Sequence, residues 1–486
     1  MNFLLEALYS RCKEAPLKAL LCSGEKCLNL FDTKEEVKAL SEHLKDARVA
    51  AVLMDNSPQW LITDLALMNV EAVSVPLPLF FSAEQLSFAI KDSGADTVIT
   101  DTPYVFENAY RIDHVACAGK KIYIHKVSNA KQVLPAGTFK ITYTSGSTGK
   151  PKGVCLSLDA VKDVCLSLIE AVGKKNISNH LAALPLSVLL ENIAGFYVTL
   201  LAGGTYYAPS LKSLGIYGSK SQGFGEIYES LKENNITTVI LVPELLKGLT
   251  YYMELNNAKL PSLKFAAVGG SKAGKELLDK ARFVGIPVYE GYGLSECSSV
   301  VALNTETNNK PGSVGKALPH LGIEIAKDGE IVINKTIFSG YIGKQIPNKN
   351  KKFHTGDIGK IDNDGYIHIT GRKDNLIVTP YGRNISPEWL EEELEKESTI
   401  KNAIVCQSTA GSLFAIIVPS ESAKSEKEVA KAIINTNFNL PDYANVTSFK
   451  VVEPFTAENG MIGPNGKPLR NKIIMTYIES YNKEAV

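Results

Sequence analysis

The stretch Tyr143–Val154 holds the densest set of residues that could bind a phosphate group. It reads Tyr-Thr-Ser-Gly-Ser-Thr-Gly-Lys-Pro-Lys-Gly-Val and so combines three glycines, two lysines and several hydroxyl side chains. Glycines let a backbone turn tightly and approach a ligand closely. Successive N–H groups in such a turn bind anions, Ser and Thr hydroxyls add donors, and Lys150 and Lys152 add positive charge. These residue types predict a loop that binds a polyphosphate.

The order of residues in this stretch differs from that of a Walker A loop. A Walker A loop has a glycine, four residues and then Gly-Lys followed by Ser or Thr. Here Pro151 follows Lys150, and Thr144 stands at the position of the first glycine. The alternative is a Gly/Ser-rich surface linker, but the stretch directly follows an apolar segment. We therefore favour a phosphate loop of another kind.

A second group of candidate ligands lies in Glu290–Glu296, which reads Glu-Gly-Tyr-Gly-Leu-Ser-Glu. Tyr292 offers an aromatic face for a purine, and Ser295 offers a hydroxyl for an α-phosphate. Glu296 supplies a carboxylate for Mg²⁺, which binds few carboxylates together with phosphate oxygens and water. The alternative is a buried tyrosine and a surface glutamate on either side of a glycine turn.

Three weaker motifs accompany these two. Gly269-Gly270-Ser271 follows a predicted strand and would let a flat ligand approach the backbone. Phe353–Asp357 ends in Thr-Gly-Asp, and Arg372 follows a glycine shortly afterwards. Lys467 lies in a glycine-rich turn near the C-terminus, where an isolated lysine usually belongs to a solvated tail.

Taken in order along the chain, these motifs resemble those of the adenylate-forming enzymes. This superfamily includes acyl- and aryl-CoA synthetases, peptide-synthetase adenylation domains and firefly-type luciferases. Six motifs match in the same order and cover essentially the whole chain, although Ser295 stands where the family more often has threonine. The resemblance implies that ATP or AMP is bound by Thr144, Ser145, Gly146, Ser147, Thr148, Gly149, Lys150, Lys152, Gly269, Gly270, Ser271, Gly291, Tyr292, Gly293, Asp357 and Arg372.

The resemblance also implies catalytic roles. Lys467 would bridge the substrate carboxylate and the α-phosphate, with Lys472 as the second candidate for that lysine. Glu296 would bind Mg²⁺, and Ser295 and Arg372 would act beside it. Asp357 would bind both ribose hydroxyls. Asp374 would be the hinge about which a C-terminal domain rotates between two half-reactions.

The implied reaction begins with attack of a carboxylate on the α-phosphate of ATP. It produces an acyl-adenylate and pyrophosphate, and we expect the thiol of coenzyme A to capture the acyl group. Other outcomes remain open, namely transfer to the phosphopantetheine arm of an acyl carrier protein, closure of a β-lactone, and a noncatalytic nucleotide-binding homologue.

The predicted acid is a medium- or long-chain fatty acid. The segment Leu184–Asn192 resembles the substrate segment of the fatty-acid branch, although Val188 replaces a histidine there. Val188 and Asn192 are therefore the candidates for the acyl pocket. The alternative for this segment is the start of an ordinary core helix.

Around these motifs, helical and strand-like patterns alternate, which is typical of parallel strands joined by helices. We expect a large N-terminal layered α/β domain over residues 1–373, with a β-rich subdomain from Asn309 onward. A small, mobile α+β domain would follow over residues 374–486 and carry Lys467. The predicted elements include a helix over Thr33–Leu44, a strand over Arg48–Met54, a helix over Pro58–Leu67, a strand over Thr97–Thr100, a hairpin over Ile358–Ile369 and a helix over Glu426–Phe438.

The composition narrows the possible partners and location of the protein. Fifty-two basic residues balance fifty-two acidic ones among 486, so no net field favours nucleic acid. The eight cysteines form no C-x-x-C pair, which suggests reduced thiols, no structural zinc and a cytoplasmic location. The apolar window Leu181–Ala202 contains Pro185 and Glu191 and is predicted to be buried core and not a membrane span. This leaves peripheral membrane contact open.

Overall fold

The computed structural model describes residues 2–486 except 105, 107, 145–151, 218–219, 222–223, 336, 345–350, 379–383, 409–411, 441–443, 464–465 and 485–486. Six residues of the predicted phosphate loop, Ser145, Gly146, Ser147, Thr148, Gly149 and Lys150, therefore lie outside the described residues. The chain divides into two compact units. Unit 1 comprises residues 1–322, 333–353 and 365–367, and unit 2 comprises residues 323–332, 354–364 and 368–486. The domain boundary between residues 373 and 374 stays a prediction.

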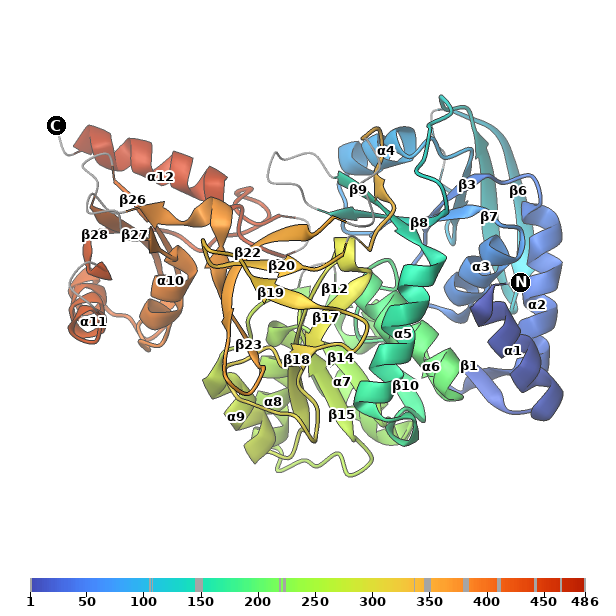
Figure 1. Ribbon diagram of the computed structural model, residues 1–486, viewed down its shortest axis with the longest axis horizontal. Coiled ribbons are helices and arrows are strands. Elements are labelled where there is room, and N and C mark those ends of the chain that lie inside the picture. Colours follow the sequence, from blue (N-terminus) through green and yellow to red (C-terminus); the bar gives the residue numbers. More distant parts are fainter. Residues whose placement is uncertain are drawn as a thin grey trace. The chain divides into compact units, whose positions relative to one another are not determined.

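Unit 1 contains an eight-stranded sheet with the order β21-β9-β8-β4-β3-β5-β7-β6 (Figure 1). Its central strands β8, β4, β3 and β5 run parallel, as the alternation of patterns predicts. Strands β8 and β9 form an antiparallel pair on either side of the phosphate loop. The strands are β3 (Val49–Leu53), β4 (Val73–Pro76), β5 (Thr97–Thr100), β6 (Ala109–Cys117), β7 (Lys120–Val127), β8 (Thr138–Thr144), β9 (Lys152–Ser157) and β21 (Gly340–Tyr341).

A nine-stranded sheet of unit 1 has the order β18-β17-β16-β15-β14-β10-β11-β1-β2. The strands from β1 to β16 in that order are parallel, so their carboxyl ends meet at one edge, where ligands bind in α/β folds. The strands are β1 (Ala19–Ser23), β2 (Lys26–Asn29), β10 (Asn179–Leu181), β11 (Thr205–Tyr207), β14 (Thr238–Leu241), β15 (Phe265–Val268), β16 (Val288–Leu294), β17 (Ser299–Leu303) and β18 (Lys316–Ala317). A separate hairpin joins β12 (Ile216–Tyr217) and β13 (Lys220–Ser221).

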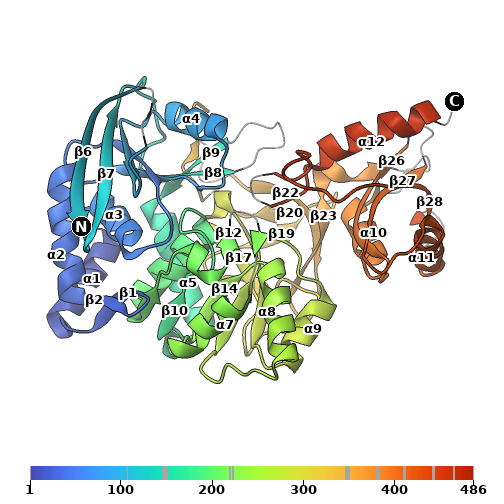
Figure 2. The same ribbon diagram turned by 180° about the vertical axis from the view of Figure 1, so that it is seen from behind.

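Helices pack against both sheets, and α7, α8 and α9 lie beside β14 and β15 (Figure 2). Helix α3 begins at Pro58 because Ser57 caps it, and nearly all its residues are buried. The helix predicted to start at Thr33 starts three residues earlier, because the Asn29 side chain accepts a hydrogen bond from the Asp32 N–H. The helices are α1 (Phe3–Glu14), α2 (Leu30–Leu44), α3 (Pro58–Asn69), α4 (Ala83–Asp92), α5 (Leu158–Val172), α6 (Val198–Ala202), α7 (Phe224–Glu233), α8 (Pro243–Leu255) and α9 (Lys275–Phe283).

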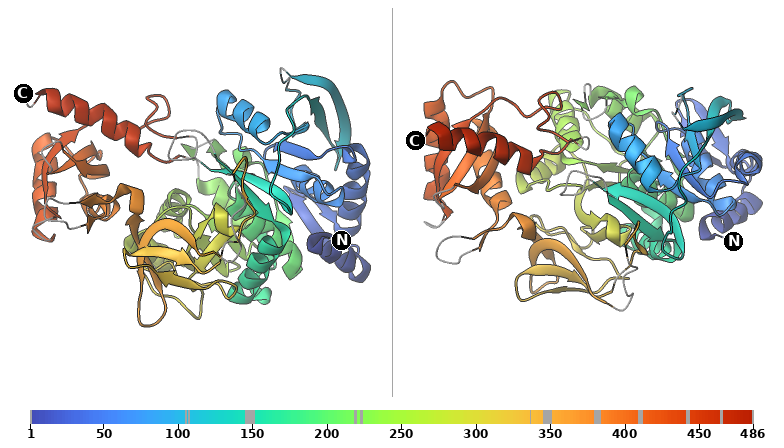
Figure 3. Two further views of the ribbon diagram at one scale, coloured as in Figure 1. Left: turned by 45° about the horizontal axis from the view of Figure 1, so that its top comes forward. Right: turned by 90° about the horizontal axis from the view of Figure 1, so that it is seen from above.

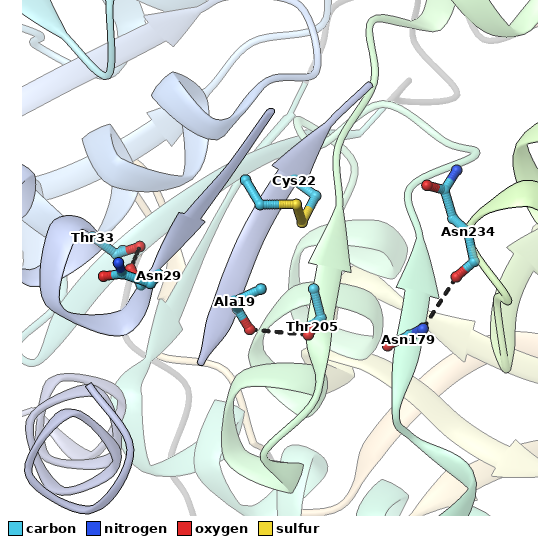
Figure 4. The surroundings of a disulfide bond; sticks show 8 residues. Ala19, Cys22, Asn29, Thr33, Asn179, Thr205 and Asn234 are labelled. Atoms are coloured by element: carbon cyan, nitrogen blue, oxygen red, sulfur yellow. Dashed lines mark hydrogen bonds between the residues drawn. A yellow bond between two sulfur atoms is a disulfide. The ribbon is translucent and has the colours of Figure 1, made fainter. Parts of the chain in front are cut away.

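The prediction that all cysteines are reduced is wrong for one pair. Cys22 and Cys27 lie directly opposite each other in β1 and β2 and form a disulfide (Figure 4). A two-residue turn separates the strands, so a spacing of five residues brings the two Cα atoms within 4.1 Å. Four residues separate these cysteines, so the pair does not match the C-x-x-C pattern. The other six cysteines are free and buried.

The apolar window Leu181–Ala202 is buried, as predicted, but part of it forms a π-helix. This element, η2 (Leu190–Tyr197), runs directly into α6. A π-helix is rare and often marks a functional site. Its Glu191 accepts hydrogen bonds from Tyr206 at 2.7 Å and pairs with His180 at 2.9 Å. None of the helices in the described part of the chain has the length and apolar character needed to cross a membrane.

A buried ion pair holds β8 against α3. Lys140 donates hydrogen bonds to both carboxylate oxygens of Asp64 at 2.8 and 3.0 Å, and neither side chain is exposed. Asp64 also accepts hydrogen bonds from Ser74, Asn192 and Tyr197. Because buried charges are costly unless they are paired and hydrogen-bonded, this many donors account for the pair's presence in the core.

Unit 2 contains most of a four-stranded sheet with the order β19-β20-β22-β23. Its strands are β19 (Ile323–Ile325), β20 (Glu330–Ile333), β22 (Phe353–Ile361) and β23 (Ile367–Arg372). The predicted hairpin joins β22 and β23, and its turn contains Gly365 at φ +83°. A short 3₁₀ helix, η5 (Lys373–Asn375), and a small hairpin of β24 (Ile377–Val378) and β25 (Asn384–Ile385) follow.

The C-terminal part of unit 2 is a three-stranded sheet of β26 (Ile400–Gln407), β27 (Leu413–Pro419) and β28 (Val446–Val451). Side chains alternate between its two faces. Helices α10 (Pro387–Glu395) and α11 (Glu426–Phe438) cover one face. Helix α12 (Arg470–Glu484) lies on the other, as Figure 3 shows. The large α/β part and the small C-terminal α+β part confirm the predicted fold class.

Candidate active site

The two ends of the phosphate loop are held next to each other. Thr144, the last residue of β8, lies directly opposite Lys152, the first residue of β9. The preceding Tyr143 donates hydrogen bonds from its hydroxyl to Ala89 O at 3.0 Å and Asp92 Oδ2 at 2.9 Å. Together with the buried Lys140 on the same strand, these contacts attach the loop to a rigid sheet. The roles of the loop residues themselves stay predictions.

The segments predicted to bind adenine are neighbours. Gly269-Gly270-Ser271 follows β15, and Glu290–Glu296 spans the end of the adjacent parallel strand β16. Gly270 has φ +85° and is exposed, which favours glycine there. The buried Glu290 accepts a hydrogen bond from the Ala273 N–H at 3.0 Å and so ties the two segments together. The structure thus brings Tyr292, which is half-buried, next to the Gly-Gly turn.

The chain reverses sharply after Glu296. A 3₁₀ turn, η4 (Ser295–Cys297), is followed by Ser298 and Ser299 at φ +57° and +108°. A residue other than glycine at such angles is strained, and this strain is often found at functional sites. The hydroxyls of Ser298 and Ser299 are buried and have no hydrogen-bond partner among the described residues. This turn directs Glu296 toward β21.

One tyrosine, which no sequence motif indicated, contacts two residues that are predicted to bind magnesium and phosphate. Tyr341, on β21, donates a hydrogen bond from its hydroxyl to Glu296 Oε1 at 2.8 Å. The Lys152 ammonium lies 3.7 Å from the centroid of the same ring. Burial, and then the Glu296 carboxylate, raise the pKa of Tyr341, so its hydroxyl stays protonated and can donate. No local pattern in the sequence marks Tyr341 as part of a ligand site.

The donor set at Glu296 fits a magnesium ion. Among the described residues, Tyr341 is the one side chain that hydrogen-bonds to Glu296, so the second carboxylate oxygen remains available. Mg²⁺ is usually bound through one or two carboxylates plus phosphate oxygens and water. No group of three or more potential His, Cys, Asp or Glu ligands occurs in the described part of the chain. A metal ion that is bound together with a nucleotide needs no such group, because phosphate oxygens and water supply its other ligands.

Unit 2 positions the predicted ribose ligand. Asp357, on β22, pairs through Oδ1 with Arg372 Nη1 at 2.7 Å, and the guanidinium side chain is 51% exposed. Gly356, which precedes Asp357 in the same strand, has φ +74°, and its N–H donates to Glu330 Oε1 at 2.9 Å. Lys373 donates to Glu330 at 2.8 Å. Asp357 and Arg372 are therefore held side by side, as their predicted roles require.

Lys467 lies at the exposed end of a small loop in unit 2. Its carbonyl accepts a hydrogen bond from the Gly463 N–H at 2.8 Å. Arg470, at the start of α12, pairs with the Glu391 carboxylate at 2.7 Å and donates to the Val405 carbonyl. Arg470 follows Lys467 by three residues in the sequence. Its side chain is mostly buried and attaches the lysine loop to α10 and β26.

The two candidates for the acyl pocket differ in their surroundings. Val188 is half-buried just before η2. Asn192 is buried, and its side chain accepts from Lys140 at 2.7 Å and donates to Asp64 at 3.3 Å. Their role as pocket residues stays a prediction. Asp374 lies in η5 and is exposed, as a hinge residue would be.

Comparisons with known proteins agree with this arrangement. The family model described as "AMP-binding enzyme" matches residues 10–342. The long-chain-fatty-acid–CoA ligase FadD15 of Mycobacterium bovis is 26% identical, with 88% of this chain and 86% of that protein covered. The 2-succinylbenzoate–CoA ligase of Bacillus mycoides is 27% identical, with 84% and 86% covered.

Solved structures show the same fold. The o-succinylbenzoate CoA synthetase (MenE) of Bacillus subtilis, in complex with its acyl-adenylate intermediate, has a TM-score of 0.79 at 22% identity, with 96% of this chain and 97% of that chain covered. The anthranilate CoA ligase AuaEII has a TM-score of 0.80 at 14% identity, with 99% and 98% covered. The chain belongs to the AMP-binding enzyme family and thus to the adenylate-forming superfamily. Within it, the chain is an AMP-forming acid–thiol ligase.

Proposed function

We propose that this enzyme uses ATP and Mg²⁺ to convert a carboxylic acid to an acyl-adenylate, and then transfers the acyl group to coenzyme A. The observation that carries the proposal is the Glu296 carboxylate. Among the described residues, only Tyr341 hydrogen-bonds to it, through Oε1, and the Lys152 ammonium lies 3.7 Å from the centroid of the same tyrosine ring. Lys152 closes the predicted phosphate loop. A metal ligand and a phosphate-binding cation are thus supported by one side chain.

The chemistry requires two anions to approach each other, because an ionised carboxylate must attack a charged phosphate. When bound at Glu296, Mg²⁺ would supply positive charge to the phosphates. Lys152 and Lys150 hold the phosphates, Ser295 donates to the α-phosphate, and Lys467 neutralises charge between the carboxylate and the α-phosphate. Preorganised electrostatics of this kind is usually the largest catalytic contribution. No general base is needed, since the acid is already ionised at neutral pH.

Asp357 and Arg372 serve the nucleotide in this scheme. The carboxylate accepts hydrogen bonds from the ribose hydroxyls, and the half-exposed guanidinium donates to ribose or phosphate. The pair at 2.7 Å orients both groups before the nucleotide arrives. Tyr292 and the Gly269–Ser271 turn provide the flat surface for adenine.

We propose a medium- or long-chain fatty acid as the substrate, which the likeness to FadD15 supports. The relatives named for 2-succinylbenzoate favour a second candidate, an aromatic acid of that kind. Coenzyme A is the favoured acceptor because the names of these relatives specify it, whereas none of those named here specifies a carrier protein. A cytoplasmic location is the corresponding proposal for the compartment.

The test measures pyrophosphate release from ATP and Mg²⁺ with a panel of medium-chain and long-chain fatty acids and 2-succinylbenzoate. The Glu296→Gln variant is the matched control and should be slower by at least ~10²-fold, which is typical for the loss of one electrostatic stabiliser. A second assay offers coenzyme A or a phosphopantetheine-bearing carrier protein to the preformed acyl-adenylate. ATP binding without pyrophosphate release across the panel would favour a noncatalytic homologue, and an unaffected Glu296→Gln variant would remove Glu296 from the site.

A further inference from the structure

Tyr341 contacts two side chains of opposite charge in different ways. Its hydroxyl donates to Glu296 Oε1 at 2.8 Å, while the face of its ring lies 3.7 Å from the Lys152 ammonium. Lys152 and Glu296 form no direct ion pair among the described residues, although one side chain contacts both. The tyrosine therefore keeps a cation and a carboxylate close together but separate.

The position of the ring is itself fixed by the fold. Tyr341 lies opposite Val154 in the antiparallel pair of β21 and β9. Val154 follows Lys152 by two residues on β9. The ring also packs edge to face against Phe338, with ring centroids 5.0 Å apart, and Phe338 packs against Phe353. Backbone pairing and aromatic packing leave the side chain little freedom. A rigid side chain is suited to holding other groups at a set distance.

We infer that Tyr341 is a positioning residue for adenylation, which orients Glu296 toward the metal and keeps Lys152 from pairing with it. This inference rests on the proposed function, since it assigns Glu296 to Mg²⁺ and Lys152 to phosphate. Hydrogen bonds to a metal ligand fix its orientation, and their loss typically weakens metal binding 10- to 100-fold. A cation over an aromatic face is attracted to it without losing its charge. Lys152 thus stays available to a phosphate group.

The two contacts can be removed one at a time. Tyr341→Phe removes the hydrogen bond to Glu296 but keeps the ring beneath Lys152. Tyr341→Leu removes both and leaves Lys152 free to pair with Glu296. Tyr228→Phe is the control, because it removes the hydroxyl of another, more deeply buried tyrosine of unit 1, which donates to the Lys259 carbonyl at 3.3 Å.

The experiment measures binding of Mn²⁺ together with a nonhydrolysable ATP analogue by electron paramagnetic resonance, with thermal unfolding as the check on folding. Tyr341→Phe should weaken Mn²⁺ binding by at least about tenfold, while the affinity for the analogue without metal stays unchanged. Tyr341→Leu should weaken both. Tyr228→Phe should change neither.

The outcomes separate this inference from the proposed function. If wild-type protein binds Mn²⁺ and the analogue, but Tyr341→Phe binds Mn²⁺ within about twofold of wild type, Tyr341 has no positioning role and the proposed function stands. If Tyr341→Phe lowers the unfolding temperature and leaves Mn²⁺ affinity unchanged, the residue is structural. If wild-type protein binds neither Mn²⁺ nor the analogue, both the proposed function and this inference fail.

Discussion

Two carboxylates of this protein form ion pairs of nearly equal length in different surroundings. Asp64 and Lys140 lie 2.8 Å apart in the core of unit 1, and both side chains are fully buried. Asp357 and Arg372 lie 2.7 Å apart in unit 2, but the guanidinium is 51% exposed. In the first pair every neighbour is a protein group, whereas in the second the exposed side faces solvent. We interpret the closed pair as support for β8 and the open pair as a nucleotide ligand.

The closed pair should have the largest effect on stability. Lys140→Met leaves Asp64 buried without its cation, which typically costs about 3–5 kcal/mol. The measurement is the free energy of unfolding in urea. The double variant Asp64→Leu/Lys140→Met should be destabilised less than the single variant, because an apolar pair leaves no uncompensated charge. A loss below about 1 kcal/mol for Lys140→Met would show that the pair does not support the core.

Lys467 extends the comparison to a second exposed cation of unit 2, which we propose acts where negative charge builds up on the α-phosphate. Lys467→Ala should slow formation of the acyl-adenylate by at least ~10²-fold. Thiol capture of a supplied acyl-adenylate should stay within a few-fold of wild type, since that step places no new charge on the α-phosphate. The two rates are measured separately by rapid quench. Lys472→Ala tests the second candidate for this role and should leave both rates near wild type, and equal losses in both steps for Lys467→Ala would make Lys467 structural.

A substitution of Asp374 tests whether the C-terminal domain, which follows the open pair in the chain, moves during the reaction. We propose that the domain over residues 374–486 rotates about Asp374, in the exposed turn η5. Asp374→Pro would fix φ near −65° and restrict Lys373 as well. One half-reaction, most simply thiol transfer, should slow by roughly tenfold or more while the other is spared. Asp374→Ala, which keeps the backbone free, should leave both rates near wild type, and unchanged single-turnover rates in Asp374→Pro would contradict the hinge.

The open pair itself should have the smallest effect on stability. Arg372→Met removes a half-exposed partner, and such pairs contribute about 0–1 kcal/mol. The same change should raise the KM for ATP by roughly tenfold, because it removes a charged hydrogen-bond donor from the nucleotide. Urea unfolding and steady-state kinetics measure the two effects. If Arg372→Met destabilised the protein as much as Lys140→Met, both ion pairs would stabilise the fold to the same extent.

Local patterns predicted much of the fold. Helix α11 and strand β5 begin and end at the predicted residues, because capping residues and apolar runs mark their ends. The motif order was also sufficient to predict the family. The adjacency of Gly269–Ser271 and Glu290–Glu296 follows from parallel neighbouring strands.

Contacts between distant segments could not be predicted in this way. Tyr341 reaches Glu296 only because β21 pairs with β9, a pairing that no local pattern indicates. Lys140 is fully buried because it pairs with Asp64, which lies 76 residues earlier in the chain. The π-helix could not be predicted, because the spacing of apolar residues over its eight positions resembles that of an ordinary α-helix.

The hairpin of β1 and β2 has a consequence for synthesis of the protein. Strand β1 completes its pairing with β11, and the Thr205 hydroxyl donates to the Ala19 carbonyl across 186 residues of sequence (Figure 4). A ribosome adding about 5–20 residues per second needs roughly 10–40 s to make that partner. During this interval the edge of β1 that pairs with β11 has no strand partner. The nascent chain therefore presents an apolar strand edge of the kind that chaperones bind.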